Sequence, residues 1–148
     1  MKINTNPITS SLLRRGFVLI ALALVAVALS PAAWAQCSAS TLSGHYMSNQ
    51  SGTLNGLPIA QVNRLFADGI GGATGSGTVV VSGVPTDIPL ITATYSINAD
   101  CTGTLNSVPP GLSQNFVIKR DGSQVFFIVT AHPSGAATMS GEAVKLSR

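Results

Sequence analysis

Short runs in which apolar and polar residues alternate fill the chain after residue 36, and Gly-, Ser- and Thr-rich turns separate them. In the clearest run Ile91, Ala93, Tyr95 and Ile97 share one face of an extended strand, and only threonine or serine lies between them. Long helical periods are absent. The pattern predicts an all-β domain whose strands have one buried face and one wet face.

We expect eight strands, at residues 41–50, 58–67, 74–82, 88–98, 101–107, 113–120, 123–131 and 136–146. Asp121-Gly122 favours a type I′ hairpin turn, which needs positive φ at both central residues, and Asp68-Gly69 is a similar signal. Short turns between all strands indicate a single antiparallel up-and-down meander, closed as a barrel that leaves no edge strand exposed. A β-sandwich is the alternative, because strand pattern alone does not decide how the sheet closes.

The first 35 residues differ from the rest. Basic residues near the start have no acidic neighbours, residues 17–29 are an unbroken apolar run of 13, and Ala33 and Ala35 supply the small side chains of a cleavage site. This predicts a helical signal peptide over residues 1–35, cleaved after Ala35, followed by one domain over residues 36–148. A retained membrane anchor is the alternative, but a spanning helix needs roughly 20 apolar residues.

We therefore expect an exported protein, periplasmic or secreted, with no membrane attachment after cleavage. Arg14-Arg15 leaves open whether export follows the twin-arginine or the general secretory route. The net charge of +3 belongs to residues 1–35, because residues 36–148 carry five basic and five acidic side chains. A neutral domain gives no support for a nucleic-acid partner or an anionic membrane surface.

Cys37 and Cys101 are the two cysteines of the chain. Two cysteines in an exported domain predict one disulfide, and a pair of free buried thiols is the alternative. The bridge would close a loop of about 65 residues and stabilise the domain by about 4 kcal/mol in the chain-entropy model.

Signals for catalysis are weak. His45 and His132 lie 87 positions apart without a metal-ligating motif, and no nucleophile motif accompanies them. The glycine-rich segment 69–77 fits no phosphate-binding pattern and predicts a turn or a strand with a glycine corner. We therefore expect no catalytic residue, no metal site and no cofactor.

The candidate ligand-binding residues are Tyr46, Arg64, Tyr95 and Phe116. The two tyrosines and Phe116 either line a ligand cage or, more simply, fill a barrel only just wide enough for its own side chains. If Val62 faces inward, Arg64 does too and demands an anion inside. If Leu65 faces inward, Arg64 is a surface charge.

One segment is apolar on both faces and predicts either a covered outer face or a homo-oligomer interface. It comprises Val125, Phe126, Phe127, Ile128 and Val129.

Gly44-His45-Tyr46 is similar to the G-x-W or G-x-Y opening of calycin barrels such as lipocalins and avidins. Together with Cys37, Asp68-Gly69-x-Gly71 and the segment 95–104, it resembles exported bacterial small β-barrel proteins, related in outline to the allene oxide cyclase barrel. This resemblance favours the register with Arg64 outside. Residues 36–148 contain no tryptophan, so the biotin cage of avidins and the strand-one tryptophan of lipocalins have no counterpart.

Three functions are compatible with these features. The favoured one is a non-enzymatic binding module for a small apolar ligand. A cavity-shaping isomerase or cyclase would need at least one reactive side chain in the cavity, chosen from His45, Tyr46, Arg64, Tyr95 and Glu142. An envelope or interaction protein without a pocket would self-associate through residues 125–129.

Overall fold

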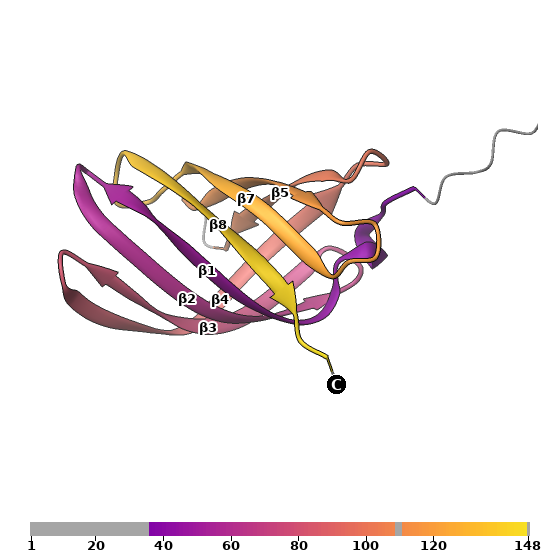
Figure 1. Ribbon diagram of the computed structural model, residues 1–148, viewed down its shortest axis with the longest axis horizontal. Helices are drawn as coiled ribbons and strands as arrows, with labels where there is room; N and C mark the ends of the chain where they lie inside the picture. The colour runs from indigo at the N-terminus through magenta and orange to yellow at the C-terminus, as the bar shows by residue number, and fades with distance from the viewer. Residues whose placement is uncertain (1–35, 109–110, 148) are drawn as a thin grey trace, which may run out of the picture. The chain divides into compact units, whose positions relative to one another are not determined.

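The computed structural model describes residues 36–108 and 111–147, so the predicted signal peptide lies outside the described residues. The elements are η1 (Ala39–Thr41), β1 (Ser43–Leu54), β2 (Leu57–Asp68), β3 (Gly72–Val81), β4 (Val84–Ile97), β5 (Thr102–Ser107), β6 (Ser113–Ile118), β7 (Gln124–Ala131) and β8 (Ala137–Lys145). Each strand pairs antiparallel with the next, and β8 pairs with β1 (Figure 1). The all-β meander is confirmed, and it closes as a barrel and not as a sandwich.

Two turns that the sequence analysis did not use set the lengths of the longest strands. Asn55 and Gly56 have φ values of 51° and 78°, and Ser82 and Gly83 have 50° and 84°. Positive φ at both central residues is the requirement of a type I′ turn, whose twist matches the flanking strands. β1 therefore continues to Leu54 and β4 begins at Val84.

The predicted type I′ turn at Asp121-Gly122 is wrong in type, although a turn is present. Gly122 has a φ of 70°, but Asp121 does not adopt positive φ. The Gly122 N–H donates to the Lys119 carbonyl, and the Asp121 carboxylate accepts from the Ser123 N–H. The connection is a longer turn in which only glycine takes the left-handed conformation.

One end of the barrel is closed by the disulfide and two tyrosines. Cys37 and Cys101 are bonded, as predicted, with a Cα–Cα distance of 5.0 Å. The Tyr46 hydroxyl donates to the Gly122 carbonyl at 2.7 Å. The Tyr95 hydroxyl donates to a carbonyl of the segment before β1 and accepts the Gly69 N–H at 2.9 Å. The Tyr95 hydroxyl thereby ties the turn after β2 to the amino-terminal segment, and the Tyr46 hydroxyl ties the β6–β7 turn to β1.

The inward side chains form two apolar clusters along the barrel. The larger cluster lies at the disulfide end and includes Tyr46, Phe116 and Ile118. The smaller includes Ile59 and Met139. A disulfide is typical of a non-reducing compartment. Within the described ranges, no helix is long and apolar enough to cross a membrane.

Candidate functional site

The barrel interior contains a cavity of about 310 Å³. Small side chains create it, because four inward positions on β2, β3, β4 and β8 hold alanine, each less than 8% exposed: Ala67, Ala73, Ala93 and Ala143. Larger residues from the other strands, among them Leu105 and Phe127, complete the apolar wall. The volume lies at the lower end of the roughly 300–1,000 Å³ typical of small-molecule sites.

A chain of side-chain hydrogen bonds crosses this apolar interior. Gln50 Nε2 donates to Gln61 Oε1 at 2.7 Å, and Gln61 Nε2 donates to Asn63 Oδ1 at 2.7 Å. Asn63 Nδ2 donates to Ser48 Oγ at 3.1 Å, and Gln114 Nε2 reaches Gln50 Oε1 at 3.4 Å. We call these five residues the amide chain. All five line the cavity, so it has a polar band between apolar walls.

Strand register explains how the amide chain forms. Ser48 is directly opposite Asn63, and Gln50 is directly opposite Gln61, in the β1–β2 ladder. Alternation from Tyr46 turns Ser48 and Gln50 inward. Facing side chains of an antiparallel pair lie close enough to interact, so each pair can form its hydrogen bond without distorting the strands.

Glycines on the neighbouring strands make room for the amides. Gly77 of β3 pairs with Asn63, and Gly141 of β8 pairs with Gln50. A Cβ at Gly77 would collide with the Asn63 amide and the Val62 carbonyl, and one at Gly141 would collide with the Asn49 carbonyl and lie 2.7 Å from Gln50 Cβ. Both expectations for the glycine-rich segment 69–77 hold in part: residues 69–71 form the turn, and the strand β3 begins at Gly72, with Gly77 leaving room for the Asn63 amide.

The amides are stably buried because they are paired. Ser48, Gln50 and Asn63 are all less than 10% exposed. In the described part of the chain, no buried side-chain nitrogen or oxygen lacks a hydrogen-bond partner. Burying an unpaired amide would cost about 1–3 kcal/mol. Because every member of the amide chain has a partner, the chain avoids this cost and holds the interior side chains in one arrangement.

The cavity opens at the end away from the disulfide. β5 pairs with β4 only at residues 93–97, which leaves residues 84–92 of β4 without a β5 ladder partner. Two residues of β4 bulge opposite Ser76 of β3, between the pairs Gly75–Ile91 and Gly77–Ile88. Leu90, Val108 and His132 line the cavity at this end, and the exposure of Leu90 (69%) and Val108 (51%) marks it as the mouth.

Among the described residues, two titratable side chains line the cavity, His132 and Tyr46. Burial lowers the pKa of His132, which favours its neutral ring at pH 7, and Nδ1 accepts the Ser134 N–H at 3.1 Å. Burial raises the pKa of Tyr46, so its hydroxyl also stays neutral. The lining therefore carries no charge at neutral pH.

Only two of the four predicted ligand-binding residues line the cavity. Tyr46 and Phe116 line the cavity, while Tyr95 lies in the closed end and holds turns together. Arg64 is exposed on the outer face, because Leu65 and Ala67 point inward, so an anion-binding interior built on Arg64 is wrong. The amide chain was not predicted from the sequence, although alternation from Tyr46 and from Leu65 places its β1 and β2 members on the inward face.

The residues proposed for an isomerase or cyclase are also dispersed. Among them only Tyr46 lines the cavity, and its hydroxyl hydrogen is already donated to Gly122. His45 is exposed, with its ring centroid 5.0 Å from that of Phe66, and Glu142 accepts from Gln124 at 2.8 Å outside. The described residues contain no cluster of three or more potential metal ligands.

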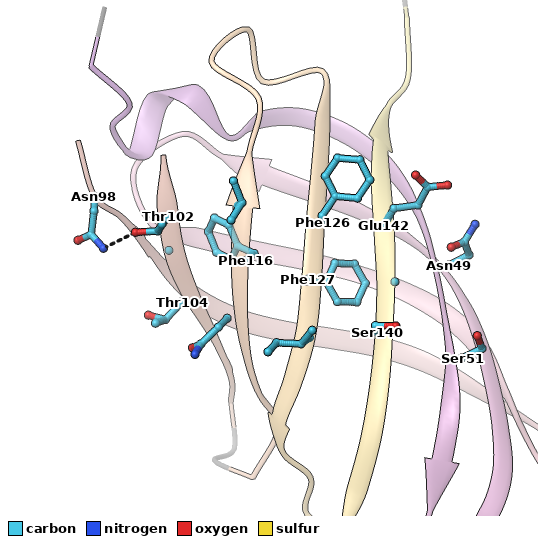
Figure 2. Close-up of a pocket in the computed structure, with 15 residues that line it drawn as sticks. Asn49, Ser51, Asn98, Thr102, Thr104, Phe116, Phe126, Phe127, Ser140 and Glu142 are labelled. Atoms are coloured by element: carbon cyan, nitrogen blue, oxygen red, sulfur yellow. Dashed lines mark hydrogen bonds between the residues drawn. The ribbon is translucent and has the colours of Figure 1, made fainter. Parts of the chain in front are cut away.

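A second hollow lies on the outer face of β5 to β8 and β1. Figure 2 shows Phe126 beside Glu142, with Asn49 beyond them. Phe126 is 50% and Ile128 54% exposed, while Val125, Phe127 and Val129 are buried. Residues 125–129 therefore present apolar side chains on both the inner and the outer face of β7. The hollow measures about 970 Å³ but is a shallow surface, open to solvent along one side.

Comparison of the chain with protein-family models, curated proteins and solved structures finds no match.

Proposed function

We propose that the protein is a non-enzymatic binding module that holds a small, neutral and mostly apolar molecule inside the barrel. The observation that carries the proposal is the 310 Å³ cavity with an uncharged lining and one open end. Ligand sites are typically concave and apolar with a few polar groups that fix orientation, and the amide chain supplies such groups.

Enclosure favours the interior over the outer hollow. Side chains from all eight strands or their adjoining turns surround the interior cavity, so a ligand there loses most of its contact with water. The outer hollow would leave one side of a small molecule in solvent. Since apolar burial gives roughly 25 cal/mol per Å², the enclosed site gains more affinity from the same ligand.

We propose further that the module works outside the cytoplasm, in the periplasm or after secretion. The Cys37–Cys101 disulfide supports a non-reducing environment. The basic, apolar and small-residue pattern of residues 1–35 supports export followed by cleavage after Ala35.

The test uses N-phenyl-1-naphthylamine, a neutral apolar dye whose fluorescence rises when it leaves water. We expect saturable binding by the unmodified protein. Ala93→Leu should weaken it by filling the cavity, and Val108→Trp should weaken it by blocking the mouth.

Val117→Trp is the matched comparison, because Val117 is 52% exposed against 51% for Val108 but faces outward on β6, where it lines the outer hollow. Loss of dye binding in Val117→Trp alone would place the dye in the outer hollow and refute the interior site. Circular dichroism confirms that each variant is folded. Equal dye binding by all four proteins would refute the interior site.

Self-association through the outer face is a second candidate, favoured by the exposure of Phe126 and Ile128. Size-exclusion chromatography with light scattering tests it: a stable oligomer that Phe126→Ser and Ile128→Ser dissociate would support it. A monomer at all concentrations would refute it.

A further inference from the structure

The amide chain has a direction. Each amide nitrogen donates to the next carbonyl or hydroxyl oxygen, from Gln114 through Gln50, Gln61 and Asn63 to Ser48. A chain of this kind ends in a free acceptor on one side and a free donor on the other. The acceptor end is the Gln114 carbonyl oxygen, and the donor end is the Ser48 hydroxyl hydrogen.

The acceptor end lies beside the mouth. Gln114 is the second residue of β6 and follows the loop that bears Val108 and Leu112, both of which line the cavity. Within the described residues, its Oε1 accepts no hydrogen bond, and its Nε2 contact with Gln50 is the longest of the amide chain at 3.4 Å. The Gln114 amide can therefore adjust to a ligand group at little cost.

The remaining lining sets limits on charge. Among the residues that the structure describes, no Asp, Glu, Lys or Arg side chain lines the cavity. An ionised carboxylate or ammonium group placed there would lose its hydration without gaining an opposite charge, which costs far more than an amide hydrogen bond returns. A neutral group that can donate one hydrogen bond fits the lining best.

We propose that the preferred ligand is an uncharged aliphatic alcohol, whose hydroxyl donates to Gln114 Oε1 while its hydrocarbon part packs against the inward alanines. This rests on the proposed function of the interior cavity and adds the chemical class of its ligand. The hydroxyl oxygen can also accept the second N–H hydrogen of an amide, so a single small group satisfies the open end.

Isothermal titration calorimetry at pH 7.5 tests the proposal with three eight-carbon probes: octan-1-ol, octan-2-one and sodium octanoate. The ketone accepts hydrogen bonds but donates none, and the octanoate is charged. We expect octan-1-ol to bind about three- to tenfold more tightly than octan-2-one, the effect of one hydrogen bond. Octanoate should bind at least about tenfold more weakly than the alcohol.

Gln114→Met keeps the length of the side chain but removes its acceptor, so it should abolish the preference of alcohol over ketone. Gln124→Met is the matched control: Gln124 bonds to Glu142 outside the cavity, and its loss should leave the preference intact.

Equal binding of all three probes, or a preference that survives in a folded Gln114→Met variant, would overturn the alcohol proposal while leaving the cavity as a binding site. Failure of every probe to bind would overturn the proposed function as well. If Gln114→Met does not fold, the ranking of the three probes on the unmodified protein decides alone.

Discussion

Gln50 Nε2 lies 2.7 Å from Gln61 Oε1, across the β1–β2 ladder and inside the barrel. Two glutamines facing each other on neighbouring strands would be ordinary on a wet surface. Here Gln50 is only 4% exposed. The pair therefore belongs to a buried polar band in a barrel whose other inward side chains form two apolar clusters. This relationship is the basis of the site and of the first two predictions.

Gln50→Leu should destabilise the fold by about 1–3 kcal/mol, because it leaves Gln61 and Gln114 without their shared partner in a low-dielectric interior. Urea unfolding followed by circular dichroism measures the change. Gln124→Leu, on the outer face of β7, should cost less than about 0.5 kcal/mol. Equal effects of the two substitutions would contradict the structural role of the amide chain.

Gly77→Ala should destabilise the barrel by about 1–3 kcal/mol, because the added methyl group collides with the Asn63 amide and with the backbone carbonyl of Val62. Thermal unfolding measures it. Ser76→Ala changes the neighbouring, outward-facing position and serves as the control. A neutral Gly77→Ala would contradict the close approach of β2 to Gly77, both by the Asn63 side chain and by the Val62 carbonyl.

Tyr95→Phe should cost about 1–3 kcal/mol, because the Leu42 carbonyl and the Gly69 N–H both lose their partner when the hydroxyl is removed. Tyr46→Phe removes a hydroxyl with one backbone partner and should cost less. Chemical unfolding of the two variants checks the order. The reverse order would show that the closed end depends chiefly on the Tyr46–Gly122 contact.

Asp68→Asn should make the free energy of unfolding fall less steeply as the pH is lowered. The N–H of Ile70, then those of Gly72 and Gly71, hold the pKa of Asp68 below its usual 3.8. A lowered folded-state pKa gives stabilisation that is complete above the unfolded pKa and disappears as pH falls through the folded pKa. The effect should therefore be confined to pH below about 5.

Urea midpoints between pH 2 and pH 7 measure this dependence. Asp87→Asn is the control, since the exposed Asp87 accepts one hydroxyl hydrogen bond, from Thr78. Unchanged acid sensitivity in Asp68→Asn would exclude Asp68 as a source of the pH dependence.

Alternation and turn signals were sufficient to predict eight strands in an antiparallel meander, and two cysteines in an exported domain predicted the disulfide. Closure as a barrel was the favoured expectation because it leaves no edge strand, but the strand pattern alone did not exclude a sandwich. The orientation of β2 could not be decided from β2 alone. Val62 and Phe66 on one face are as apolar as Leu65 and Ala67 on the other, so the period of two gives no preference. The ambiguity arises because β2 keeps two large apolar side chains on its outer face, where Val62 is 57% and Phe66 43% exposed.

The amide chain was not predicted for a different reason. Ser48, Gln50, Gln61 and Asn63 are residue types that usually face water, and this preference argues against the inward position that alternation from Tyr46 and Leu65 gives them. Only the pairing of β1 with β2 reveals that each has a hydrogen-bonding partner inside. Pairing register is a tertiary property, and single-strand patterns do not contain it.

A xenon-derivative crystal structure tests the central claim most directly, because xenon enters apolar cavities regardless of the natural ligand. The account predicts a xenon peak inside the barrel, between Ala93, Leu105 and Phe127. A structure in which xenon lies only in the outer hollow against Phe126, or in which side chains fill the interior and no peak is present, would contradict it.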